Sequence, residues 1–159
     1  MTSQSFYRTL LAQLSQGPVV VATVIAADVT IPTESTTVGA KLLVWGDAET
    51  CGPLDAAPLM QPAFEVMKTG LPQQVTLAHG GNLQIWLARW QGVDAIATVQ
   101  SILSNLSSER PQRLVIPLVS GQTAYVIEAG QSLRNLQGQN AFIEEITEWP
   151  VNHRTLNAA

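Results

Sequence analysis

The apolar residues near the N-terminus recur with a helical period. Phe6, Leu10, Leu11 and Leu14 fall at positions i, i+4, i+5 and i+8, so they form one stripe along a helix. The Gly-Pro pair at residues 17–18 predicts the end of this helix, because neither residue continues a helix well.

Two further stretches have helical spacing. Residues 55–69 place apolar side chains on one side of a helix, in which Pro58 fits a first turn and Pro62 either kinks the helix or marks its true start. A second apolar stripe follows Asp94, which we expect to cap a helix that continues to about Leu106.

The β-branched and apolar runs between these helices predict strands. Residues 19–26 are almost all apolar, which is typical of a central strand buried on both faces. A polar loop at residues 28–39 separates them from a second strand at residues 40–45. Glycine-containing turns predict two hairpins. Their strands are residues 74–78 with 83–89, and residues 113–119 with 123–128.

These elements predict one α/β or α+β domain with a single mixed sheet of five to six strands and three to four helices. The last apolar residues, Phe142, Ile143 and Ile146, fit either a short helix or a strand. We expect the domain to span residues 1–150 and residues 151–159 to form a flexible tail.

Composition narrows the class of protein. Only 13% of residues are charged and the chain has four tryptophans, a combination that favours an apolar self-association face, most simply in a homodimer. The net charge is −4 and the basic residues are scattered, so we expect no nucleic-acid partner. No run is long enough for a membrane span, and no secretory signal precedes the first helix. With its single cysteine, the chain fits a cytoplasmic protein.

The side chains that could carry chemistry are few. Cys51 lies near the start of a predicted helix, where a thiol pKa can fall, and His79 lies in a glycine turn. A catalytic pair would need these two residues within hydrogen-bond reach, and we predict no self-contained catalytic site and no metal site. Hydroxyls of residues 33–37 precede Lys41 in a polar loop, but no Walker pattern is present. Three glutamates at residues 144–148 predict a solvated acidic face.

The order of motifs resembles the XdhC/CoxI family, the accessory proteins of xanthine dehydrogenase and related molybdenum hydroxylases. Residues 6–45 are similar to the family's opening helix, its strand ending in Ala-Thr-Val, and its Gly-Ala-Lys strand, matched here by Gly39, Ala40 and Lys41. The His-Gly-Gly turn at residues 79–81 resembles the family's Cys-Gly-Gly turn. The resemblance covers residues 5–128 and implies the N-terminal module of that family, without its C-terminal Rossmann-like domain.

The chain departs from the family pattern at the loops that handle ligand. Ser35 and Thr36 stand at the Pro and Arg places of the family's Ser-x-Pro-Arg loop. Residues 55–60, Asp-Ala-Ala-Pro-Leu-Met, replace a Gly-Gly-Gly-Cys-x-Glu turn, and His79 replaces the cysteine of the Cys-Gly-Gly turn. Glycines allow a backbone to approach a phosphate, whereas alanine and proline obstruct it.

The resemblance implies a non-enzymatic accessory domain whose ligand would be the molybdenum cofactor and whose partner would be a molybdenum hydroxylase. The alternative is a protein-interaction module or structural homodimer with no small ligand. The cofactor-binding residues that the resemblance suggests come from three segments. They are Thr36, Gly39, Lys41, Gly52, Asp55, His79, Gly80 and Gly81.

Overall fold

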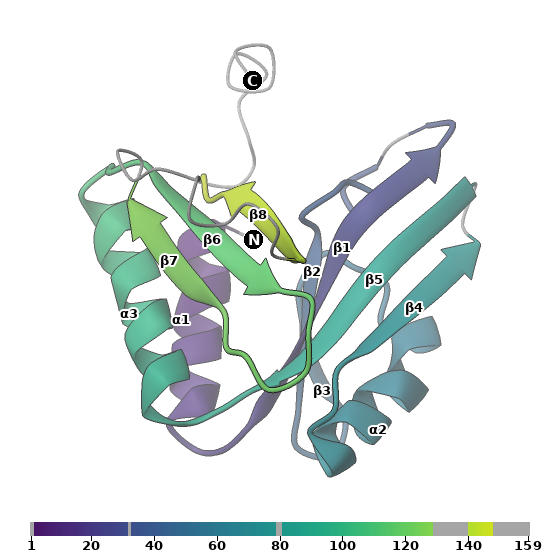
Figure 1. Ribbon diagram of the computed structural model, residues 1–159, viewed down its shortest axis with the longest axis horizontal. Coiled ribbons are helices and arrows are strands. Elements are labelled where there is room, and N and C mark those ends of the chain that lie inside the picture. Colours follow the sequence, from purple (N-terminus) through teal and green to yellow (C-terminus); the bar gives the residue numbers. More distant parts are fainter. Residues whose placement is uncertain (1, 32, 79–80, 129–139, 148–159) are drawn as a thin grey trace.

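The computed structural model describes residues 2–31, 33–78, 81–128 and 140–147 and contains two antiparallel sheets with three α-helices (Figure 1). The elements in chain order are α1 (Ser3–Leu14), β1 (Val19–Val29), β2 (Lys41–Trp45), β3 (Glu49–Cys51), the 3₁₀ turn η1 (Ala57–Leu59), α2 (Met60–Thr69), β4 (Gln73–Ala78), β5 (Gly81–Trp90), α3 (Gly92–Ser107), β6 (Gln112–Pro117), β7 (Tyr125–Glu128) and β8 (Ala141–Glu145). The predicted α+β class is confirmed. The strands divide into sheets of five and three rather than forming one sheet.

Strand β1 lies at the centre of the larger sheet, whose order is β3-β2-β1-β5-β4. Its first six residues, Val19 to Val24, are all buried, as predicted for a central strand. Alternate side chains of a strand point to opposite faces, so these residues contribute to two separate cores. Val20, Ala22 and Val24 pack beneath α2, whereas Val19 and Val21 face α1, α3 and the smaller sheet.

The predicted helices form with adjusted ends. Helix α1 begins at Ser3, where the side chains of Thr2 and Ser5 form a capping box. Helix α2 begins at Met60, after η1, so Pro62 falls in its first turn, where its missing N–H costs nothing. Helix α3 has Gln91 as its N-cap. The prediction that Asp94 caps it was wrong, since Asp94 lies within the first turn.

Both predicted hairpins are confirmed, as β4 pairs with β5 and β6 pairs with β7. The ambiguous segment after residue 140 is a strand, β8, on the other side of β6. The polar loop begins later than predicted, because Asp28 and Val29 still pair with β5. The proposed tail at residues 151–159 lies outside the described residues. Within the described residues, no helix is long and apolar enough to cross a membrane.

The two sheets are inclined to each other like the two arms of a V (Figure 1). The smaller sheet lies against α1 and α3, which are side by side, and α2 covers the far face of the larger sheet. Side chains from α1, from both sheets and from α3 meet in one core. Its buried members include Phe6, Leu10, Val99, Ile102, Leu114 and Ile116. A polar contact between the two sheets therefore lies beside this apolar core.

Candidate functional site

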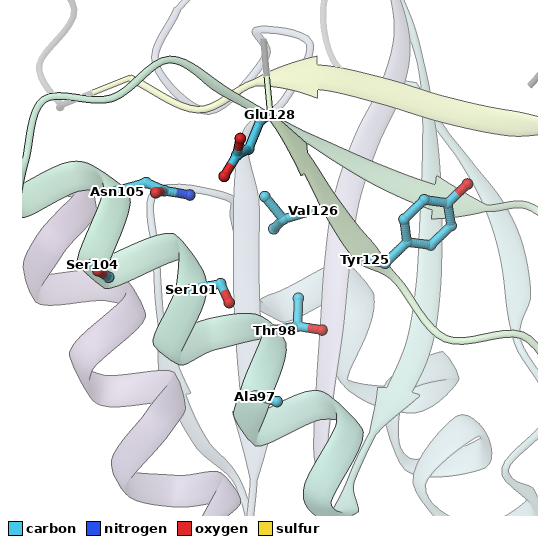
Figure 2. Close-up of a pocket in the computed structure, with 8 residues that line it drawn as sticks. All are labelled: Ala97, Thr98, Ser101, Ser104, Asn105, Tyr125, Val126 and Glu128. Carbon is cyan, nitrogen blue, oxygen red and sulfur yellow. The ribbon is translucent and has the colours of Figure 1, made fainter. Parts of the chain in front are cut away.

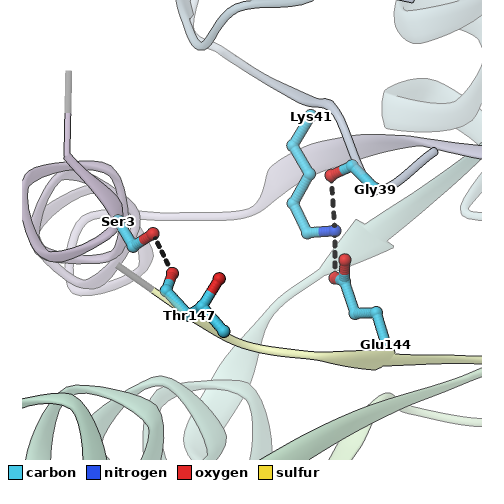
Figure 3. Close-up of polar contacts among 5 residues, drawn as sticks. All are labelled: Ser3, Gly39, Lys41, Glu144 and Thr147. Atoms are coloured by element: carbon cyan, nitrogen blue, oxygen red, sulfur yellow. Dashed lines mark hydrogen bonds and ion pairs between the residues drawn. The ribbon is translucent and has the colours of Figure 1, made fainter. Parts of the chain in front are cut away.

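The lysine of the Gly-Ala-Lys motif is buried. Lys41 is the first residue of β2 and is only 1% exposed. Its ammonium group donates a hydrogen bond to the Gly39 carbonyl at 3.3 Å and forms an ion pair with the carboxylate of Glu144 in β8 (Figure 3). Glu144 is therefore not part of a solvated acidic face, and the prediction that it would be was wrong at this residue.

The alternation of β2 explains why this lysine points inward. Leu42 and Val44 face α2, so Lys41 and Leu43 face the opposite side, toward the smaller sheet. An uncompensated buried ion costs several kcal/mol. Glu144 supplies the compensating charge from a strand 103 residues further along the chain.

Gly39 makes room for this ion pair. Its φ of +95° is in the region that favours glycine, and a Cβ at this position would lie 2.8 Å from Oε2 of Glu144. The next residue, Ala40, packs into the core beneath α2. The Gly-Ala-Lys motif thus combines space for a carboxylate, a small core residue and the cation that the carboxylate neutralises.

The hydroxyl groups of the preceding loop bond within the loop. Thr36 is 3% exposed, and its Oγ1 accepts a hydrogen bond from the Thr33 amide at 2.7 Å. The Thr37 hydroxyl donates to the Thr33 carbonyl at 2.6 Å. Glu34 and Thr37 are exposed at the surface of the same loop. The groups that resembled a polar cradle therefore hold the loop in shape.

The segment after β3 packs onto the backbone of β2. The Leu54 amide donates to the Lys41 carbonyl at 3.2 Å, and a Cβ on Gly52 would lie 2.4 Å from the same oxygen. Asp55 is exposed, and its Oδ1 accepts a hydrogen bond from the Ala57 amide at 3.4 Å as η1 begins. Gly52 therefore allows two backbones to approach closely, which matches the structural use of glycine.

Cys51 ends the edge strand β3 and does not lie at the start of a helix. The thiol is partly buried, and this burial raises the pKa of Cys51. A raised thiol pKa is the opposite of what a nucleophilic cysteine needs at neutral pH. Its approach to His79 cannot be described, because His79 and Gly80 lie outside the described residues.

The structure brings Gly39, Lys41 and Gly52 together but places Gly81 elsewhere. The Gly39 amide bonds the Val24 carbonyl at 2.8 Å, whereas Gly81 pairs with Val29, five residues further along β1. At about 3.3 Å per residue this separation is roughly 15 Å. A Cβ on Gly81 would lie 1.9 Å from the Asp28 carbonyl oxygen, so this glycine also serves close backbone packing.

Sequence reasoning missed Glu144 as a member of this site. Phe142 and Glu144 in β8 alternate with Ile146, the residue directly after the strand, and the two apolar residues pack into the core shared by both sheets. A glutamate between two apolar residues on one face of a strand is a signal of a buried carboxylate that needs a cation. Tyr7 belongs to the same region, because burial and then the Glu144 charge raise its pKa well above 10.

A second polar region lies between α3 and β7. A hollow of about 380 Å³ lies there. Figure 2 shows the side chains that line it, among them the hydroxyls of Thr98 and Ser101, the Tyr125 phenol and the carboxylate of Glu128. Of the described residues, no histidine, cysteine or lysine lines this hollow. Across the described residues, no group of three or more His, Cys, Asp or Glu side chains is arranged to hold a metal ion.

Comparison with known proteins gives a structural likeness only. No protein-family model matches the sequence, and no curated protein matches it. Among solved structures, the fold is similar to that of a xanthine dehydrogenase from Bacillus halodurans. The TM-score is 0.66 at 16% identity, and the match covers 91% of this chain and 52% of that one. The chain thus spans about half the length of the protein it matches, and at this identity the likeness shows the fold.

Proposed function

We propose that this chain is a non-catalytic accessory domain that acts beside a molybdenum hydroxylase of the xanthine-dehydrogenase type. It would do so by binding the protein rather than by holding the molybdenum cofactor. The fold likeness to a chain named xanthine dehydrogenase supports the type of partner, as does the resemblance of residues 5–128 to the XdhC/CoxI family. The inference that the chain does not hold the cofactor is based on the burial of Lys41 in an ion pair with Glu144.

The residues that would meet the cofactor do not suit its anionic phosphate. Lys41 is the only basic side chain among the described residues of the three candidate segments, and its charge is already neutralised. Thr36 stands where the family has an arginine, and its hydroxyl bonds within its own loop. Asp55 adds a negative charge beside alanines and a proline in place of a glycine turn.

The test is co-expression of the tagged chain with the molybdenum hydroxylase of the same organism, in a host that makes the cofactor. Anaerobic purification is followed by mass spectrometry for the hydroxylase and by the fluorescence of oxidised pterin for the cofactor. We expect the hydroxylase to co-purify, and the chain expressed without it to carry only background pterin. Absence of the hydroxylase would refute the accessory role. Stoichiometric pterin on the chain expressed alone would refute the inference that these loops do not hold the cofactor.

A second candidate function is self-association without any small ligand. Its specific support is a set of large apolar side chains left on the surface. Among the described residues these are Ile31, Val38, Phe64, Leu71, Val93 and Val119, which are 38–81% exposed. Sedimentation at micromolar concentration should then give a species near twice 17.1 kDa. A monomer under these conditions would refute self-association. The exposed apolar side chains would then be a surface for binding a different protein.

A further inference from the structure

Strand β4 is an open edge of the larger sheet. The order β3-β2-β1-β5-β4 leaves it paired on one side only, with β5 (Figure 1). Alternate residues of an edge strand turn their N–H and C=O groups away from the sheet, where another strand can bind them. Within the described residues the two sheets have four edge strands, which are β3, β4, β7 and β8. Strand β4 differs from the other three.

The other three edge strands carry features that hinder pairing with another chain. Strand β3 has only three residues and begins with Glu49, and β7 has four residues and ends with Glu128. Strand β8 contains Glu144 and Glu145. Short length and charge are two of the means by which proteins protect edge strands. In contrast, β4 has six residues, Gln-Gln-Val-Thr-Leu-Ala, with no charge, no proline and no shift of register against β5.

The segment that contains this edge is neutral and partly apolar. Residues 60–78, which form α2, β4 and the link between them, contain one acidic and one basic residue, although the whole chain has a net charge of −4. These two residues, Glu65 and Lys68, are both exposed. Phe64 and Leu71 of the same segment are 43% and 59% exposed. A second copy of this segment would therefore meet no net charge repulsion and would find apolar side chains to bury.

The two faces of β4 differ, and this difference restricts how a second copy can pair with it. Val75 and Leu77 pack against the core beneath α2. Gln74 and Thr76 are exposed on the opposite face, where both donate to Oε1 of Gln84, at 3.1 and 2.9 Å. Residues directly opposite each other in an antiparallel sheet point to the same face. A two-fold axis must therefore pair odd-numbered residues with odd-numbered ones, and even with even.

We propose that two copies of this chain pair through β4, antiparallel, into one continuous sheet with the two-fold axis at Thr76. This register places Thr76 opposite the same residue of the second copy and pairs Val75 with Leu77 twice. Threonine pairs and β-branched apolar pairs both stabilise antiparallel strands. An axis at Val75 would instead place the polar Gln73 opposite Leu77. The proposal rests on the self-association candidate above and assigns its interface.

A charge placed at the axis tests this interface. Sedimentation velocity at micromolar concentration should show a dimer of the unmodified chain. Thr76→Glu should weaken the association by roughly tenfold or more, because like charges directly opposite each other destabilise a strand pair. Thr50→Glu is the matched control, since Thr50 is also an exposed threonine but lies in β3, at the other edge of the sheet. This control should remain a dimer, and circular dichroism checks that both variants are folded.

Opposite charges at the axis should restore the dimer. Thr76→Lys alone should weaken the association as Thr76→Glu does, because each variant brings two like charges together. An equimolar mixture of the two variants should sediment as a dimer, since a glutamate then faces a lysine across the axis. A variant that had only lost its fold would not be rescued by mixing.

A disulfide cross-link tests the register. Cys51 is the only cysteine, so Cys51→Ser combined with Thr76→Cys leaves one thiol per chain, at the axis. Directly opposite residues of antiparallel strands have Cα atoms about 4.5–5.5 Å apart, which suits a disulfide. Mild oxidation should therefore give a covalent dimer. Cys51→Ser with Gln74→Cys is the matched control and should not cross-link, because the two copies of residue 74 would lie roughly 14 Å apart.

The outcomes separate this interface from self-association in general. A monomeric unmodified chain at micromolar concentration would refute both, and would leave β4 as an edge for a strand of another protein. A dimer that Thr76→Glu does not weaken would overturn the β4 interface alone and place self-association on another surface. Failure of the Thr76→Cys variant to cross-link in a dimeric sample would overturn the proposed axis.

Discussion

Replacing Glu144 with glutamine should destabilise the domain severely although the side chain keeps its shape. The Lys41 side chain is 1% exposed and that of Glu144 is 16% exposed, so solvent cannot replace the lost carboxylate. Removing one partner of a buried ion pair costs about 3–5 kcal/mol, because the other charge stays buried and unpaired. Against a total of about 5–15 kcal/mol, this is a large share of the free energy of unfolding. The expected fall in Tm is about 10 °C.

Urea unfolding followed by circular dichroism measures this loss, and the neighbouring Glu145→Gln supplies the control. Glu145 is 67% exposed and pairs with Arg113 at 3.6 Å, so its replacement should cost at most about 1 kcal/mol. The double variant Lys41→Met with Glu144→Leu removes both charges and should recover most of the stability. If Glu144→Gln costs no more than Glu145→Gln, the account of the buried pair is wrong.

Four further perturbations test other parts of the structure. Gly52→Ala should cost at least about 2 kcal/mol in urea unfolding, because its Cβ would meet the first carbonyl of β2. Gly46→Ala, with φ +59° and nothing within 4 Å of a Cβ, should cost only about 1 kcal/mol, and equal losses would contradict this reasoning. The pKa of Tyr7 lies well above 10 in the folded state, so the unfolded chain loses this proton first as the pH rises. Stability should therefore hold below about pH 10 and fall by about 1.4 kcal/mol per pH unit above it, and Tyr7→Phe should remove this component of the pH dependence. Because burial raises the pKa of Cys51, iodoacetamide should alkylate this thiol more slowly at neutral pH than it alkylates glutathione, and a faster rate would point to activation. Val21→Asp places an unpaired charge in the core and should abolish soluble expression, so a variant that melts cooperatively would contradict the central placement of β1.

Local patterns predicted the elements of this fold well. The apolar run at residues 19–26 correctly indicated a central strand, although the strand is buried throughout only over residues 19–24 and Ala26 is exposed. The glycine turns correctly indicated both hairpins. These signals are local, because a turn or a two-sided strand is encoded by neighbouring residues. The division into two sheets was not predicted, since no local pattern states which hairpin pairs with which strand. Pairing β6 with β8 instead of with a strand of the larger sheet is a long-range choice.

Three of the residues that the resemblance suggests for cofactor binding lie close together. Gly39, Lys41 and Gly52 do lie together, but the role of Lys41 depends on Glu144, which the sequence analysis placed on a solvated face. Periodicity indicates which face of a strand a residue occupies but not which distant side chain lies opposite. The role of the glycines could not be predicted either. Both close backbone packing and ligand binding require a residue without a side chain, so the sequence does not distinguish them.

The ion pair between β2 and β8 also sets an order in time during synthesis. All five strands of the larger sheet leave the ribosome before Glu144 is made, yet Lys41 remains without its counter-charge until then. At about 5–20 residues per second, the 103 intervening residues take roughly 5–20 s. Until then the larger sheet either stays loose around Lys41 or holds an unpaired cation. Its charge balance is therefore completed only by β8, the last strand among the described residues.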